Sequence, residues 1–146
     1  MRRKSFLKVC ALQCLAGSAL LTPLQNCSST QSIAVTHSDN QLTVPVSAFA
    51  IERNGDVKYK HVIVVRHEKL DFPVAIYRTN TTDYRAFMLR CTHQGSELNV
   101  YGDLISCSAH GSEFDNMGNV MQGPAEQRLK QYAVRATSDN LYISLT

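Results

Sequence analysis

Apolar and polar residues alternate in short runs along most of the chain, and turn residues separate these runs. Leu42-Thr43-Val44-Pro45-Val46 alternates, and its proline, which has no backbone N–H, favours the edge of a sheet. Asn54-Gly55 is typical of a two-residue hairpin turn. His61-Val62-Ile63-Val64-Val65 is rich in β-branched residues, which predicts a strand buried on both faces.

The rest of the chain continues this pattern. We expect further strands at 72–77, 84–90, 104–106, 114–115, 120–121, 131–135 and 141–145. No sustained helical period accompanies them. The pattern therefore predicts an all-β domain built from stacked antiparallel sheets.

Positive charge is concentrated at the beginning of the chain. The net charge is +3, four basic residues lie within the first eight positions, and every Asp and Glu lies after residue 27. Removing those four charges from +3 leaves about −1. A basic surface for nucleic acid is therefore not indicated, and we expect no nucleic-acid partner.

Two motifs in the second half carry the chemistry. They read Cys91-Thr92-His93-Gln94-Gly95 and Cys107-Ser108-Ala109-His110-Gly111, with thirteen residues between the first His and the second Cys. Thiolates and imidazoles suit a transition metal or an iron–sulfur centre. If the motifs form paired loops, the two thiolates can hold one iron and the two imidazoles the other, which is the ligation of a Rieske [2Fe–2S] centre. A disulfide between the cysteines and a zinc site are the alternatives.

Together the motifs resemble those of Rieske-type iron–sulfur domains, over roughly residues 41–146. Gly123-Pro124-Ala125 resembles the proline loop with which that family shields its cluster. The resemblance implies a fold whose cluster-binding part covers about residues 89–125 and holds one [2Fe–2S] cluster. It further implies four ligands, which are Cys91, His93, Cys107 and His110. Gly123 and Pro124 would shield the cluster.

Two departures from this family concern the loops around the expected cluster. The Rieske proteins of cytochrome bc complexes have a further cysteine in each loop, and the two form a disulfide. Here these positions are Ser96 and Ala109, so packing and hydrogen bonds alone must hold the loops. High-potential members use a Ser and a Tyr as hydrogen-bond donors to the cluster and to a ligand sulfur. This chain has Ser112 and Phe114 there, so we expect only Ser112 to donate.

The first 26 residues are expected to be an export signal. Basic residues precede an apolar run, and Arg3-Lys4-Ser5-Phe6-Leu7-Lys8 resembles the twin-arginine pattern R-R-x-F-L-K, with an ordinary Sec signal as the alternative. Leu24-Gln25-Asn26-Cys27 resembles a lipoprotein cleavage site, and Cys27 is the one cysteine without another assignment. We therefore expect lipidation at Cys27, with an uncleaved membrane anchor over residues 6–24 as the alternative.

The polar residues 27–40 are expected to form a flexible linker, followed by the Rieske-type domain at 41–146. The expected function is one-electron transfer between redox partner proteins, without catalytic residues of its own. We expect the protein to be exported across the bacterial cytoplasmic membrane and tethered there, on the periplasmic or outer face. The alternatives are the small Rieske subunit of a periplasmic oxidoreductase such as arsenite oxidase, and a structural zinc-binding module.

Overall fold

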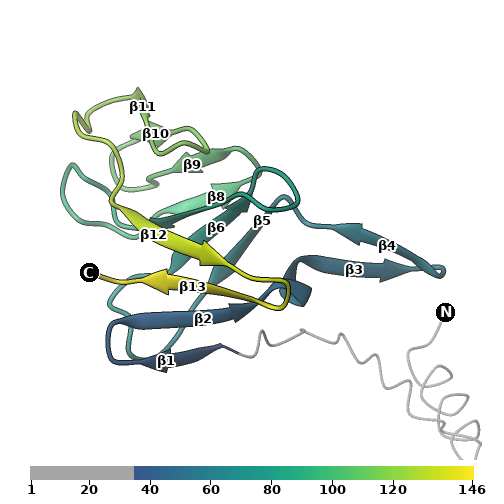
Figure 1. The fold of residues 1–146 in the computed structure, drawn as a ribbon. Helices are drawn as coiled ribbons and strands as arrows, with labels where there is room; N and C mark the ends of the chain where they lie inside the picture. The colour runs from purple at the N-terminus through teal and green to yellow at the C-terminus, as the bar shows by residue number, and fades with distance from the viewer. Residues whose placement is uncertain (1–34) are drawn as a thin grey trace, which may run out of the picture. The chain divides into compact units, whose positions relative to one another are not determined.

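The computed structural model describes residues 35–146, which form antiparallel sheets (Figure 1). The larger sheet has seven strands in the order β1-β2-β13-β12-β7-β6-β5. These strands are β1 (Thr36–Ser38), β2 (Gln41–Pro45), β5 (Val62–Val65), β6 (Val74–Arg78), β7 (Tyr84–Met88), β12 (Gln131–Ala136) and β13 (Asn140–Ser144). The predicted all-β fold is confirmed.

A smaller sheet of four strands has the order β11-β10-β9-β8. Its strands are β8 (Asn99–Tyr101), β9 (Leu104–Ser106), β10 (Glu113–Phe114) and β11 (Val120–Gln122). A separate hairpin of β3 (Ala50–Arg53) and β4 (Asp56–Tyr59) follows one 3₁₀ turn, η1 (Val46–Phe49). Figure 1 shows the four-stranded sheet beyond one end of the larger sheet, and the β3–β4 hairpin projecting from the larger sheet. Within residues 35–146, no helix is long and apolar enough to cross a membrane.

Several predicted turns and strands are observed as expected. Asn54 and Gly55 turn the β3–β4 hairpin with φ of 55° and 85°, the left-handed conformation that such turns need. The four residues Val74 to Tyr77 of β6 are all buried, because Val74 and Ile76 pack into one group of apolar side chains and Ala75 and Tyr77 into another.

Two predictions about strand environment were wrong. β2 is not an edge strand, because β1 pairs with it on one side and β13 on the other; Pro45 is tolerated because it is the last residue of the strand. β5 is the edge strand instead. It alternates, with Ile63 and Val65 buried and Val64 36% exposed, so it is not buried on both faces.

The sheet also begins earlier than expected. β1 lies within the segment predicted to be a linker, where His37 pairs with Leu42. Its Thr-His-Ser sequence has no apolar pattern to mark it as a strand, and backbone pairing with β2 holds it. The predicted export signal, its twin-arginine-like pattern and Cys27 lie outside the described residues.

The interior has two groups of buried apolar side chains. The first group packs against the larger sheet and includes Leu42, Phe49, Ile76 and Ile143. The second group connects the two sheets and contains, besides Phe87, Leu89, Phe114 and Leu129, both cysteines of the ligand motifs.

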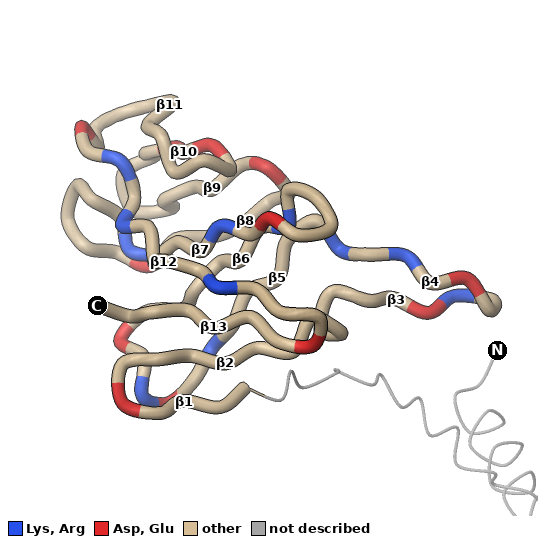
Figure 2. Tube along the Cα trace, in the orientation of Figure 1, with Lys and Arg blue, Asp and Glu red and all other residues tan. Residues whose placement is uncertain are grey.

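Basic and acidic residues are interspersed along the trace rather than collected on one element (Figure 2).

Candidate metal centre

Each cysteine–histidine motif forms a loop between two strands. The first loop (residues 91–96) lies between β7 and β8, and the second loop (residues 107–112) lies between β9 and β10. Leu89, just before the first loop, is buried. An antiparallel bridge between Arg90 and Glu97 closes the base of that loop. Pairing of β8 with β9 then fixes the two loops to the same small sheet.

Short backbone hydrogen bonds give both loops their shape. The N–H of Cys91 donates to the Ser96 carbonyl at 2.8 Å, and the N–H of Gly95 donates to the Cys91 carbonyl at 2.8 Å. Gly95 has φ of 79°, and a Cβ there would lie 3.1 Å from Arg90 Nε. The positive φ therefore favours glycine here, while the flexible Arg90 side chain could shift away from a Cβ.

The two thiols lie together at the base of the loops. Cys91 and Cys107 are buried in the second apolar group, and both are free thiols, so the disulfide alternative is not formed. Burial would raise the pKa of the Cys107 thiol. Hydrogen bonds from the backbone at Ala109 and His110 lower it, as do the Cys91 and Ser96 side chains, and its pKa lies below its usual range. A lowered pKa favours the thiolate, which is the form that binds metal.

The two imidazoles form a second pair. The ring centroids of His93 and His110 are 5.0 Å apart, with the rings at 90°. Nδ1 of His93 is buried and has no hydrogen-bond partner among residues 35–146, which is costly unless another group satisfies it. No group of three or more His, Cys, Asp or Glu side chains within residues 35–146 could hold a single metal ion. Two pairs, one of sulfur and one of nitrogen, suit a two-iron centre whose irons have different ligands.

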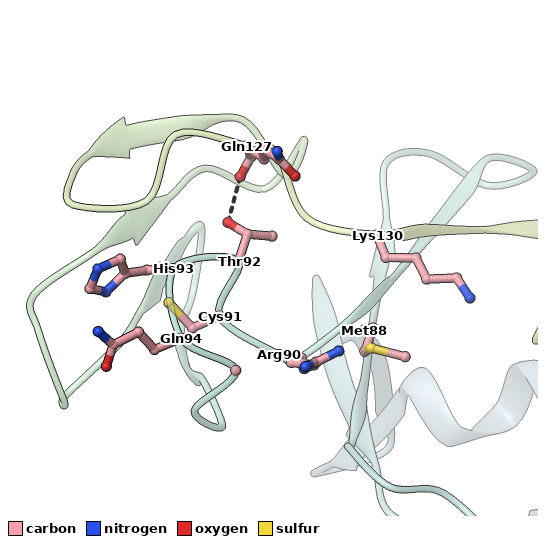
Figure 3. Close-up of a pocket in the computed structure, with 9 residues that line it drawn as sticks. Met88, Arg90, Cys91, Thr92, His93, Gln94, Gln127 and Lys130 are labelled. Atoms are coloured by element: carbon pink, nitrogen blue, oxygen red, sulfur yellow. Dashed lines mark hydrogen bonds between the residues drawn. The ribbon is translucent and has the colours of Figure 1, made fainter.

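Two side-chain hydrogen bonds hold the loops to the rest of the domain. Thr92 donates its hydroxyl to the Gln127 carbonyl at 2.6 Å, in the segment before β12 (Figure 3). In Figure 3, Thr92 points towards Gln127, and the side chains of Cys91 and His93 project elsewhere. Gln122 of β11 donates its amide to the Gly111 carbonyl at 3.0 Å. Sequence reasoning missed Thr92, Gln122 and Gln127, because nothing in their local sequence indicates these long-range contacts.

The predicted proline loop lies against the second loop. Ala125 follows Pro124, is buried, and donates its backbone N–H to the Ser112 hydroxyl oxygen at 3.0 Å. Ser112 is itself fully buried. The structure thus brings the Gly123-Pro124-Ala125 segment to the site.

A cavity of about 480 Å³ opens beside the first loop (Figure 3). Met88, Arg90 and Lys130 line it, together with Cys91 and His93. Residues of the first loop therefore border this cavity.

Comparison with known proteins agrees with this geometry. A family model described as Rieske [2Fe-2S] domain matches residues 47–133, which include both loops and the proline segment. The chain belongs to the Rieske [2Fe-2S] domain family. Its cofactor is a Rieske [2Fe–2S] cluster, with which the paired thiols, the paired imidazoles and the His93 Nδ1 that has no partner among residues 35–146 are compatible.

Curated relatives of this Rieske protein include iron–sulfur subunits of cytochrome b6-f complexes. It is 32% identical over 73 residues to the cytochrome b6-f complex iron-sulfur subunit 2 of Nostoc sp. (strain PCC 7120), a match covering 49% of this chain and 41% of that protein. It is 32% identical over 57 residues to the subunit of Chlorobaculum tepidum, covering 38% and 32% respectively. The chain thus matches less than half the length of these relatives.

Two solved Rieske structures are similar to the described part of the chain. The Rieske monooxygenase CntA, in its apo form, has a TM-score of 0.51 at 18% identity, covering 70% of this chain and 32% of that one. The plasma membrane Rieske protein PetC3 from Synechocystis PCC 6803 has a TM-score of 0.49 at 28% identity, covering 57% and 86%. The first of these likenesses supports the Rieske fold assigned to residues 35–146.

Proposed function

We propose that this Rieske protein is an exported, membrane-tethered one-electron carrier. Its cluster is held by four side chains: Cys91, His93, Cys107 and His110. The single observation that carries the ligand assignment is the buried Nδ1 of His93, which has no partner among the described residues and lies in a ring 5.0 Å from that of His110. When bound, the cluster supplies reversible one-electron reduction.

The surrounding residues bury the sulfur side of the site and leave its imidazole side open to partner proteins. The two thiols lie in the apolar group that includes Leu89 and Phe114, which keeps water from the sulfur side. His110 is exposed, so a redox partner can approach the imidazole side directly. Electron exchange with partner proteins therefore takes place at the tips of the two loops.

Ligation is tested by replacing each of the four proposed ligands with Ala in the full chain. Each change should abolish the Rieske EPR signal of the reduced protein and remove the two irons. The matched control is His61→Ala, because His61 is an exposed histidine that contacts Asp103 at 2.7 Å, away from the loops. A normal spectrum in any of the four ligand variants would contradict the assignment, and zinc in place of iron in the purified wild-type protein would contradict the function.

The membrane part of the proposal rests on sequence. Basic residues and an apolar run precede Cys27, which occupies the position of a lipidated cysteine, and a lipoprotein N-terminus supplies the several acyl chains that stable anchoring needs. Cys27→Ser should release the protein from the membrane fraction or leave an unprocessed precursor, whereas Cys10→Ser, within the expected signal, should change neither. Unchanged fractionation and processing of Cys27→Ser would favour an uncleaved anchor.

A further inference from the structure

Two basic side chains line the cavity beside the first loop, and no carboxylate does. The cations are Arg90 and Lys130, and none of the other lining residues is Asp or Glu. Glu97, which forms a backbone bridge with Arg90, contacts the Arg66 side chain at 2.5 Å instead. Within residues 35–146, no ion pair involves Arg90 or Lys130. The cavity therefore has two positive charges without a protein counter-charge in the described part of the chain.

Backbone hydrogen bonds bring these two cations to the same cavity. The N–H of Met88 donates to the Lys130 carbonyl at 3.0 Å, and Met88 ends the strand β7 two residues before Arg90. Figure 3 shows Arg90, Met88 and Lys130 on one side of the view and His93 and Gln94 on the other. Arg90 and Lys130 thus come from adjacent segments that the sheet holds together.

Each cation lies near an aromatic ring. Cζ of Arg90 is 5.5 Å from the centroid of the Phe72 ring, and its Nε lies 3.1 Å from the place that a Cβ on Gly95 would take. Nζ of Lys130 is 5.0 Å from the centroid of the Tyr132 ring. A ring face attracts a cation but does not neutralise its charge. Both charges therefore remain available to a ligand.

We propose that Arg90 and Lys130 bind a small oxyanion, a phosphate or carboxylate group, in this cavity, and that its binding lowers the reduction potential of the cluster. A guanidinium presents paired N–H donors that match such an anion, and an ammonium adds a point charge. The cavity volume of about 480 Å³ lies in the range of small-molecule sites. The effect on the potential rests on the proposed ligation by Cys91 and His93, which line the same cavity.

The sign of this effect follows from charge. Reduction adds one negative charge to the cluster, so the reduced form repels a nearby anion more than the oxidised form does. The anion therefore binds the oxidised protein more tightly, and by reciprocity its binding favours the oxidised state. A threefold difference in affinity corresponds to a fall of about 30 mV, at about 59 mV per tenfold change.

Inorganic phosphate is a suitable probe, used with the full, cluster-containing protein. Calorimetric titration of the oxidised protein with phosphate should show one saturable site. Redox titration followed by EPR should show an equilibrium constant for reduction about threefold lower at saturating phosphate than without it, which is about 30 mV. Potassium chloride at the same ionic strength should produce neither result, because it tests screening alone.

Charge-removing variants locate the site. Arg90→Gln and Lys130→Gln should each retain the EPR signal, weaken phosphate binding about tenfold or more, and remove the response of the potential to phosphate. The matched controls are Arg53→Gln and Lys58→Gln, which remove the same charges from exposed positions of the β3–β4 hairpin. They should leave both phosphate binding and its effect on the potential unchanged.

The outcomes separate this inference from the proposed function. Absence of saturable phosphate binding, or equal binding in wild type and Lys130→Gln, would overturn the site even if Arg90→Gln lost its cluster. Binding that left the potential unchanged would overturn the coupling to the cluster. A purified wild-type protein without two irons would contradict the proposed function, whereas the calorimetric comparison of the variants would still test the oxyanion site.

Discussion

The buried hydroxyl oxygen of Ser112 accepts a hydrogen bond from the backbone N–H of Ala125 at 3.0 Å. This bond joins the proline segment to the second loop. Accepting this bond occupies one lone pair of the oxygen, and the hydroxyl proton of Ser112 remains available for another acceptor. We expect the cluster sulfurs to be the acceptors; one side chain would then both hold the Gly123-Pro124-Ala125 segment and tune the cofactor.

Replacing Ser112 by Ala should lower the reduction potential. The change removes the donor and leaves the Ala125 N–H buried without its acceptor. Hydrogen bonds to charged groups are worth about 1.5–3 kcal/mol, and if the two redox states differ by about half of this, the equilibrium constant changes about tenfold, or about 59 mV. Redox titration followed by EPR measures the shift. Ser144→Ala, in β13 away from the loops, is the control, and an unchanged potential in Ser112→Ala would show that Ser112 is only a structural residue.

Replacing Phe114 by Tyr should raise the potential. Phe114 is fully buried, as Cys91 is nearly, and both belong to the same apolar group, so a hydroxyl that reaches the Cys91 sulfur adds a donor. The expected rise is about 59 mV for a tenfold change. Phe49→Tyr provides the control, since it adds the same hydroxyl to the other apolar group and should affect stability but not potential. Equal potentials in wild type and Phe114→Tyr would mean that the hydroxyl does not reach the sulfur.

The sequence predicted the ligand motifs better than the long-range contacts that hold them in place. The residues of each motif are neighbours in the chain, so their ligand chemistry can be seen directly in Cys91-Thr92-His93 and in its counterpart around His110. The Thr92–Gln127 bond joins residues 35 positions apart, and no periodic pattern encodes such a contact. It depends on how the segment before β12 packs against the first loop, which only the tertiary structure determines.

Strand environment was predicted less well for a related reason. Proline and β-branched residues indicate local backbone preferences, whereas edge or centre is decided by which strands pair. Polar β1 pairs with residues 41–43 of β2, so β2 is not the last strand of the sheet, whereas Pro45 lies beyond this pairing. Val64 is exposed because it lies on the face of β5 opposite the buried Ile63 and Val65.

Replacing Gly118 by Ala should destabilise the domain strongly. Gly118 has φ of 77°, and a Cβ there would lie 2.7 Å from Phe87 Cε1, in the apolar group that contains both cysteines. Positive φ costs about 1–2 kcal/mol, and overpacking adds about 1–3 kcal/mol. Urea unfolding measures the loss. Gly102→Ala is the matched control, because Gly102 has φ of 62° with nothing within 4 Å of a Cβ. Equal losses in the two variants would show that Phe87 yields without cost.

The last prediction concerns acid stability and Asp115. This carboxylate lies in the turn between β10 and β11, where it accepts the backbone N–H groups of Met117 and Asn119, both at 2.8 Å. Burial raises the pKa of Asp115, but the Asn119 side chain, these backbone bonds and the charge of Arg128 outweigh burial and lower the pKa below its usual range. A carboxyl whose pKa is lowered by folding stabilises the native state above its unfolded pKa of about 3.9.

That stabilisation is lost as the pH falls through the lowered native-state pKa. Asp115→Asn should therefore reduce the free energy of unfolding by about 1–2 kcal/mol at pH 7, with the difference from wild type shrinking below about pH 4. Urea unfolding at a series of pH values measures this difference. Asp56→Asn, in the exposed β4 strand, removes the same charge and should give a much smaller difference. A deficit in Asp115→Asn that stays constant down to pH 2 would mean that the Asp115 side chain acts by its shape and not by its charge.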